Sequence, residues 1–350
     1  MAATDPRLAM QPARRPLATG ARAWLRQNLF ATWYHAFLSI VTLWALVQAL
    51  AAVLDWALHR AQWQVVASNL LLLLAGRYPR EELWRVWLAV AVLAGLGVAS
   101  GVAWGGSGRG RRWHLPVVAG WFVLVPAVLA VLHGAGGTQA WGGFLLTLIL
   151  ALAGITLSFP LGVLLALGRV SSLPVVRALA IAYIEGVRGT PLMVVLFFAM
   201  TALPLFLPPS ARPDLVLRAA AGLVLFTAAY VAEAVRGGLQ GVPRGQIEAA
   251  RALGLTGTQA TLLIVLPQAL RAVIPAIVGQ FISLFKDTSL VAVWGLLELV
   301  GVAQSVLSNP AFLGRHVEVY AFVGGLYWLF CYGMSYASRR LERRLGLGER

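Results

Sequence analysis

The residues best able to do chemistry are four polar side chains inside a long apolar run. Lys286, Asp287, Thr288 and Ser289 interrupt the apolar stretch 272–297. A charge at the centre of a bilayer costs about 2.5–3.5 kcal/mol, so such residues are expected to face a cavity or another protein segment. A solute that carries both an ammonium and a carboxylate group would suit this cluster. We therefore predict that it lines a substrate pathway.

A structural role for the same cluster stays open. Lys286 and Asp287 point about 100° apart on a helix, so they do not pair as residues at i and i+4 would. A helix break at this depth would expose backbone groups that only a cavity or the protein interior satisfies. The alternative is an ion pair or helix cap between subunits. Unchanged solute uptake by an Asp287→Asn variant would exclude the substrate role.

Two further pairs of opposite charge have helical spacing. Glu185 and Arg188 are three residues apart, as are Glu233 and Arg236. Pairs at i and i+3 on a helix surface contribute about 0.2–0.5 kcal/mol. We predict structural ion pairs for both rather than contacts with substrate.

A polar loop, residues 236–271, separates two apolar runs. It contains clear signals for where helices begin and end. Pro243 is expected to start a short helix and Gly254 to end it, because proline suits the first helical turn and glycine the residue after the last. A second helix is expected over 258–266, where Pro267 stops or kinks it.

Within this loop, small residues and one acid form a surface suited to docking. Ala249 and Ala250 are expected to leave a smooth helix face that another surface can approach closely. Glu248 offers one charge to a basic group of a partner. The pattern predicts a rigid helical docking segment between two membrane segments.

The elements that carry these residues are membrane helices. The chain has 350 residues, of which 59% are hydrophobic and 12% charged, whereas soluble domains have about 25% charged residues. Spanning a bilayer takes about 20 apolar residues in a helix. We predict an all-α polytopic fold with about eight spans, at residues 36–58, 86–104, 115–133, 141–167, 190–208, 217–235, 272–297 and 319–337. An interfacial helix over 178–188 would precede Pro191, near the start of the fifth span.

Arginine distribution predicts the orientation of these spans. With both termini in the cytoplasm, nineteen arginines lie in cytoplasmic segments and seven on the opposite side. Basic residues concentrate on the cytoplasmic side of membrane proteins. This distribution also explains the net charge of +15 without a nucleic-acid partner.

Several other classes of site lack their signatures. The chain has a single lysine, Lys286, between Phe285 and Asp287, so it has no G-x-x-x-x-G-K-[ST] phosphate loop. The five histidines are scattered among different segments, which predicts no metal site. Cys331 is the only cysteine, so no disulfide framework is possible. The arginine-rich N-terminus has no apolar core ahead of the first span and does not look like a removable signal peptide.

One family resemblance is specific. Glu248-Ala249-Ala250, Gly254, Ile264, Leu266 and Pro267 match the EAA motif of type I, binding-protein-dependent ABC importer permeases at every spacing. The likeness covers about 141–340. Motifs similar to the polar amino acid branch are Arg188-Gly-Thr-Pro191, Glu233-x-x-Arg236-Gly-Gly238, Gly245-Gln246 and Lys286-Asp-Thr-Ser-Leu290. The long N-terminal half and the run 194–209 resemble the larger permease subunits of general L-amino acid importers, although Val195 stands where many relatives carry glutamine.

The resemblance implies the organisation and partners of the chain. It implies an N-terminal extension, residues 1–139, with about three spans, and a permease core, residues 140–340, with five spans and the coupling loop 236–271. This chain would hold no cofactor, because ATP and Mg would be bound by separate ATPase subunits that dock on the loop. The other implied partners are a second permease subunit, with a heterodimer favoured over a homodimer, a periplasmic amino-acid-binding protein and the lipid bilayer of the bacterial inner membrane.

Three alternatives to this interpretation have different requirements. A permease for another solute could carry the same loop motif, because the amino acid assignment rests on the flanking motifs. A membrane-bound enzyme would need converging nucleophiles, bases or metal ligands, and the sequence has no such pattern. An ion-driven secondary transporter would need no docking loop and would carry more carboxylates within the membrane.

Overall fold

The computed structural model describes residues 24–25, 28–103 and 114–344. Within these ranges the regular structure is helical and no strand forms, apart from a single bridge between Gly143 and Glu298. The all-α prediction is therefore confirmed. The chain forms two compact units, residues 1–62 and residues 63–350.

The first unit is dominated by one apolar helix. Helix α2, Trp33–Asp55, continues into a π-helical turn, Trp56–Arg60, and no residue of α2 is buried. A helix that is apolar on every face suits a lipid environment. At its end Asp55 accepts Arg60 Nη2 at 2.7 Å and lies 3.3 Å from His59 Nδ1.

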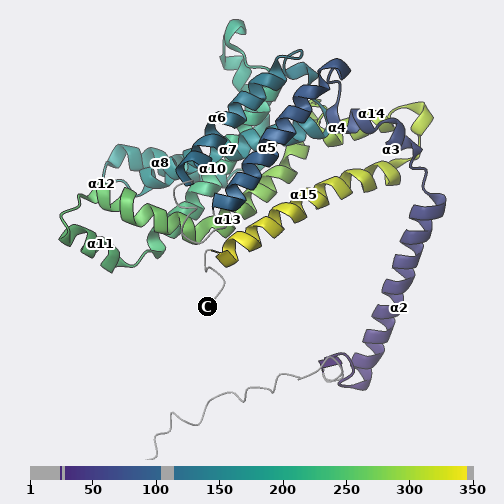
Figure 1. The fold of residues 1–350 in the computed structure, drawn as a ribbon, viewed down its shortest axis with the longest axis horizontal. Coiled ribbons are helices and arrows are strands. Elements are labelled where there is room, and N and C mark those ends of the chain that lie inside the picture. The colour runs from purple at the N-terminus through teal and green to yellow at the C-terminus, as the bar shows by residue number, and fades with distance from the viewer. Residues whose placement is uncertain (1–23, 26–27, 104–113, 345–350) are drawn as a thin grey trace, which may run out of the picture. The chain divides into compact units, whose positions relative to one another are not determined.

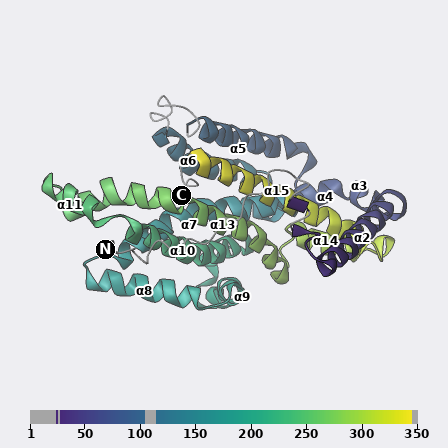
Figure 2. The same cartoon turned by 90° about the horizontal axis from the view of Figure 1, so that it is seen from below.

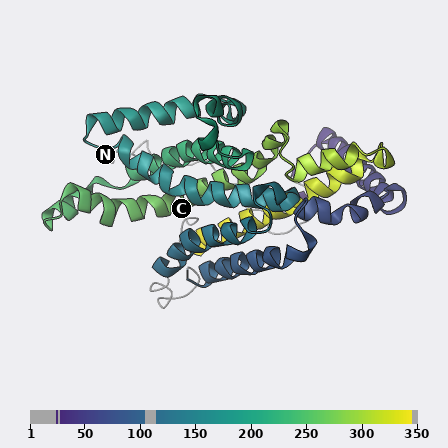
Figure 3. The same cartoon turned by 90° about the horizontal axis from the view of Figure 1, so that it is seen from above.

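The second unit contains the remaining described helices, drawn from three sides in Figures 1, 2 and 3. Their bounds are α3 Gln64–Ser68, α4 Leu70–Ala75, α5 Leu83–Ala103, α6 His114–His133, α7 Gly143–Arg169, α8 Pro174–Arg188, α9 Leu192–Phe197, α10 Leu215–Gly241, α11 Arg244–Ala252, α12 Gly257–Ala260, α13 Leu266–Asp287, α14 Leu299–Leu307 and α15 His316–Arg344.

The number of membrane-length helices agrees with the predicted spans. Seven helices in the described residues are long and apolar enough to cross a bilayer, and one bent helix pair raises the number to eight. That pair is α8 with the segment 192–206, bent by 109°. The bend falls at Gly189–Pro191, and Pro191 is the N-cap of α9. Proline restricts the preceding residue to extended backbone, which ends α8 there.

Of the two outcomes expected at Pro267, a stop or a kink, the stop is wrong. The helix after the loop does not stop at Pro267, because α12 leads through a π-helical turn, Thr261–Val265, directly into α13. A wide turn moves backbone hydrogen bonds from i−4 to i−5. Pro267 then lies in the first turn of α13, where its missing N–H is tolerated.

Helix α10 is the centre of the second unit. It packs along α7 and α13, and Figure 1 shows these three helices side by side. The contact face of α10 is built from small and β-branched residues that are fully buried, namely Ala228, Ala229, Val231, Ala232 and Val235. On α7, a Cβ on Gly162 would lie 2.6 Å from a Val231 methyl group. Small residues allow membrane helices to approach this closely.

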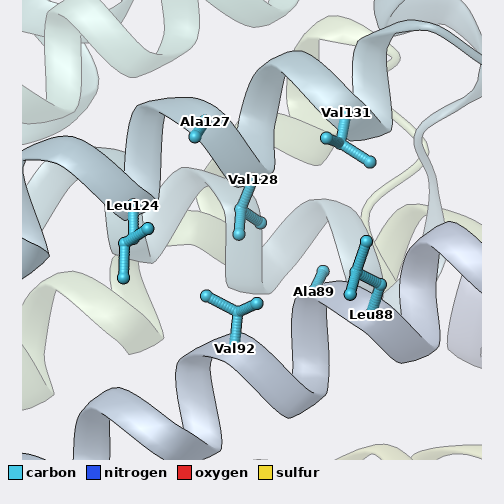
Figure 4. Close-up of a pocket in the computed structure, with 7 residues that line it drawn as sticks. All are labelled: Leu88, Ala89, Val92, Leu124, Ala127, Val128 and Val131. Atoms are coloured by element: carbon cyan, nitrogen blue, oxygen red, sulfur yellow. The ribbon is translucent and has the colours of Figure 1, made fainter.

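Helices α5 and α6 form an antiparallel pair that packs on the start of α7. Leu145 and Ile149 of α7 share a buried apolar cluster with residues of both helices. Between α5 and α6 lies an apolar cavity of about 110 Å³, lined by Val92, Leu124, Val128 and four further apolar residues (Figure 4).

The segment before α5 crosses the start of α7 at two glycines. Gly76 has φ +64° and ψ −132°, a backbone conformation open essentially to glycine alone. A Cβ on Gly76 would overlap the Cα atom of Gly142, and a Cβ on Gly142 would lie 2.9 Å from Gly76 Cα. Nearby, Tyr78 donates from its hydroxyl to the Leu132 carbonyl at 3.1 Å.

These contacts bear on domain organisation. Residues 63–139 belong to the same compact unit as the rest of the chain, and the unit begins at Trp63 rather than near residue 139. The physical reason is the close crossing of Gly76 and Gly142, a tertiary contact with no local sequence signal. The expected functional division at residue 139 stays a prediction.

We predict that Gly76→Ala destabilises the protein by roughly 1–3 kcal/mol, the usual magnitude for a non-glycine residue held in strained backbone. The backbone conformation and the overlap with Gly142 both act against the new methyl group. Thermal unfolding in detergent measures the effect. Gly95→Ala on α5 is the matched control, because a Cβ there meets nothing within 4 Å. Equal melting temperatures for the two variants would contradict the prediction.

Candidate functional site

The loop between α10 and α13 folds as a short helix at one end of the bundle. Helix α11 begins after Pro243 and ends before Gly254, which has φ +78°. Both ends lie where sequence analysis placed them. Figure 1 shows α11 and α12 beyond the ends of α7 and α10.

Side chains from the next helix hold α11 in place. Gln268 of α13 donates to the Gln246 side chain at 3.4 Å and to the Ile264 carbonyl at 2.9 Å. Thr256 and Gln259 form a capping box at the start of α12, which satisfies backbone donors at both positions. These hydrogen bonds give the loop a defined helical structure.

The exposed surface of this loop is mixed in chemistry. Glu248 and Ala249 are exposed, and Leu253 and Leu263 are 82% and 64% exposed. The exposed part of the loop therefore combines one acid with apolar side chains. Ala250 is 3% exposed, which corrects the expectation that Ala249 and Ala250 share an open face. Ala250 instead packs α11 onto the bundle.

The other residues of the predicted coupling set support this surface. Ile264 and Leu266 are partly buried, and Pro267 is exposed. Gly254 has no neighbour within 4 Å of an added Cβ, so only its left-handed backbone requires glycine.

The polar cluster in the apolar run lies where α13 changes geometry. Helix α13 ends at Asp287, and residues Thr288–Trp294 continue as a 3-10 helix. Lys286 is exposed and Asp287 and Ser289 are partly exposed. Thr288 is fully buried and its hydroxyl donates to the Phe285 carbonyl at 2.8 Å, while Ser289 donates to the Lys286 carbonyl. In this conformation Lys286 and Asp287 are the charged groups open to a solute.

A cluster of ion pairs joins α7, α8 and α10 through residues in the C-terminal half of each helix. Arg236 donates from Nε to Glu233 Oε2 at 3.0 Å, the expected i and i+3 pairing. Arg169 Nη1 and Arg188 Nη1 lie 3.5 and 3.6 Å from the same Glu233 oxygen. Three arginines thus share one carboxylate.

The expected pairing of Glu185 with Arg188 is not the one that forms. Glu185 instead lies 2.7 Å from Arg169 Nη1, and Arg188 turns to Glu233 and to the ring of Tyr230, 5.7 Å away. Both residues reach across to neighbouring helices, because α8 packs on α7 and α10. A pair within one helix surface is weak, and tertiary partners displace it.

Sequence analysis did not single out Glu298, which the structure buries completely. Its carboxylate accepts the Gly301 N–H at 2.9 Å and caps α14. It also accepts hydroxyl hydrogen bonds from Thr147 at 3.2 Å and Tyr327 at 3.3 Å. One side chain thereby ties α7, α14 and α15 together. Its sequence signal was a lone carboxylate in an otherwise apolar stretch.

Burial favours the protonated form of the Glu298 carboxyl group. This residue follows the span Gly257–Trp294, and burial raises the pKa of its carboxyl group to about 7, against the hydrogen bonds that favour the charged form. The folded state therefore binds a proton that the unfolded chain releases at lower pH.

These features define a polytopic helical membrane protein: membrane-length helices packed around α10, with a short exposed helix at one end of the bundle. The chain belongs to the family of binding-protein-dependent transport system inner membrane components, whose family model matches residues 158–347.

Relatives cover nearly the whole chain. It is 39% identical to the inner membrane amino-acid ABC transporter permease protein YhdY of Escherichia coli, over 94% of both chains. It is 36% identical to the glutamate/glutamine/aspartate/asparagine transport system permease protein BztC of Rhodobacter capsulatus, over 93% of this chain and 94% of that one. A crystal structure of an amino acid ABC transporter with histidines has a chain similar to 58% of this one, with 32% identity and a TM-score of 0.52.

We predict that stability falls as pH rises from about 4.5 to 7, by roughly 3 kcal/mol from Glu298 alone. The pKa of this acid is higher folded than unfolded, so its contribution is complete below the unfolded pKa and is lost toward the folded one. Thermal unfolding of the wild type and Glu298→Gln between pH 4.5 and 8 measures it. The glutamine variant, which does not titrate, should show a flatter profile, and parallel profiles would contradict the assignment.

Proposed function

We propose that this chain is the membrane-spanning permease subunit of an ATP-driven importer of polar amino acids, and that separate ATPase subunits drive it through α11. The observation that carries the proposal is α11 itself, which presents Glu248, Ala249 and Leu253 outside the bundle and is fixed at both ends. Glu248 and Ala249 of the EAA motif lie on this surface, whereas Ala250 packs α11 onto the bundle.

The proposed transport cycle uses a single docking surface, α11, that is connected to several membrane helices. A binding protein delivers substrate to the outer face, and ATP binding draws the ATPase subunits together around α11. Helix α13 continues from the loop with only the π-helical turn between them, so movement of the loop reaches the membrane directly. Hydrolysis on the partner chains resets the permease, and the ATP and Mg belong to those chains.

The substrate class rests on two supports. The relatives are named for amino acids, and Lys286 with Asp287 offers opposite charges to a zwitterion. Lys286 is exposed on a membrane helix without an ion-pair partner among the described residues. A charged side chain at that depth must be shielded from lipid. A second permease subunit would provide this shielding. We propose a heterodimer, with a homodimer as the alternative.

The orientation we propose places both termini and α11 in the cytoplasm. Arginine asymmetry supports it, and an ATPase that uses cytoplasmic ATP can dock only there. The segments 63–79, 134–142, 207–214 and 295–315 then lie at the outer end of the bundle.

We predict that Glu248→Lys abolishes co-purification of the ATPase subunits and reduces radiolabelled amino acid uptake at least tenfold. Charge reversal in the centre of a docked surface places like charges together, which costs several kcal/mol. Glu81→Lys is the matched control, an exposed acid before α5 on the proposed outer side. Retained ATPase with normal uptake in Glu248→Lys would refute the coupling role. A panel of labelled amino acids and other solutes distinguishes a permease for a different substrate.

A second prediction tests orientation. In a Cys331→Ser background, Leu253→Cys and Leu313→Cys place single thiols at sites 82% and 68% exposed. A membrane-impermeant maleimide applied to spheroplasts should label the residue 313 site at once and the residue 253 site only after permeabilisation. The opposite order would invert the topology and remove α11 from the ATPase.

A further inference from the structure

A cavity of about 270 Å³ lies where the segment before α5 meets the core. Its walls come from the α4–α5 connection with Arg77, the segment 138–142, the start of α10 with Asp214, and residues 295–297. In the proposed orientation it opens at the outer end of the bundle. It shares no residue with the cluster Lys286–Ser289.

The walls of this cavity are firmly held. The Gly76–Gly142 crossing places Arg77 on one rim. Gly143 N–H donates to the Leu297 carbonyl at 2.8 Å, which fixes the opposite segment. Asp214 caps α10 by accepting the Leu217 N–H at 2.7 Å and also accepts the Thr138 hydroxyl at 2.6 Å. A site with fixed walls binds a small ligand without first having to order itself.

Two opposite charges border the cavity without neutralising each other. Arg77 is exposed and has no hydrogen bond or ion pair with any described residue. Asp214 is an exposed residue, and its carboxylate pairs with no cation of the described residues within 4.0 Å. Its hydrogen bonds use one lone pair on each oxygen, so it can accept further donors. Both groups therefore keep capacity for a ligand.

The arrangement selects the chemistry of that ligand. A simple anion attracted by Arg77 would be repelled by Asp214, and a simple cation would meet the converse. A small molecule with a carboxylate and an ammonium satisfies both. Apolar residues Leu72, Leu215 and Val302 line the remaining wall, and the cavity suits one small molecule rather than a protein segment.

An adjoining cavity offers space for a side chain. It has a volume of about 300 Å³ and a mostly apolar lining. Thr138, Trp141, Asp214 and Val216 line both cavities. A ligand whose charged groups lie between Arg77 and Asp214 would direct its side chain along this shared wall.

We propose that this cavity binds one free α-amino acid at the outer end of the permease, with Arg77 on the carboxylate and Asp214 on the ammonium group. The N-terminal half of the chain thus supplies half of a substrate site. The inference rests on the proposed function, and it adds a site for the amino acid outside the pathway at Lys286–Ser289.

Equilibrium binding tests the proposal. The full-length chain, co-purified with its partner subunits and placed in nanodiscs without the binding protein, is titrated with labelled amino acids that the wild type imports. We expect Arg77→Gln to weaken binding about tenfold or more, the effect of losing a charged hydrogen bond. Arg80→Gln is the matched control, an exposed arginine three residues away, and should bind as the wild type does.

Competing analogues assign each charge separately. The decarboxylated amine should compete weakly in the wild type and more strongly in Arg77→Gln, because the variant removes the repulsion between Arg77 and the cation of the amine. The N-acetylated amino acid should likewise compete weakly in the wild type and more strongly in Asp214→Asn, because the variant removes the repulsion between Asp214 and the carboxylate of this analogue. The asparagine amide oxygen can accept the Leu217 N–H, and its NH2 group can donate to the Thr138 hydroxyl oxygen. Thermal unfolding confirms that each variant is folded.

The outcomes separate this inference from the proposed function. Absence of amino acid uptake by the wild-type complex overturns the proposed function. Normal wild-type uptake with equal binding by Arg77→Gln and Arg80→Gln overturns the site alone. Analogue competition that changes with neither variant overturns it as well.

Discussion

Close packing of α10 against α7 and α13 is the constraint on which the rest of this structure depends. In hydrocarbon, apolar surface gains nothing by leaving lipid, so helices associate through tight contact and a few polar bonds. Small residues such as Ala228 and Gly162 permit that contact. Because the three helices form one packed body, a movement imposed on α11 by the proposed ATPase subunits would reach the bundle through α13.

Polar groups then distinguish the two ends of this body. At one end, Glu233 gathers Arg169, Arg188 and Arg236 from three helices. At the other, Glu298 ties α7, α14 and α15 together from a fully buried position. Each carboxylate fixes the relative position of the helices that it links, because its polar bonds are directional and apolar contacts are not.

The segment from residue 63 to α5 adds to the core rather than standing apart from it. Its crossing at Gly76 and Gly142 is closer than any side chain would allow, and it brings Arg77 to the same cavity as Asp214. This gives the N-terminal half a proposed part in contact with solute, beyond that of a membrane anchor.

The sequence by itself determined the helical class, the spans and the helix in the coupling loop, because hydropathy, proline and glycine act locally. The Glu233–Arg236 pair was also predictable, since its partners lie within one helical turn. Other features were decided by the tertiary structure alone. Glu185 pairs with Arg169, Ala250 is buried and Pro267 lies within a continuous helix. Glu298 is completely buried, and Arg77 borders a cavity. Each of these depends on which helices lie side by side, and that arrangement is set by contacts between residues far apart in the chain.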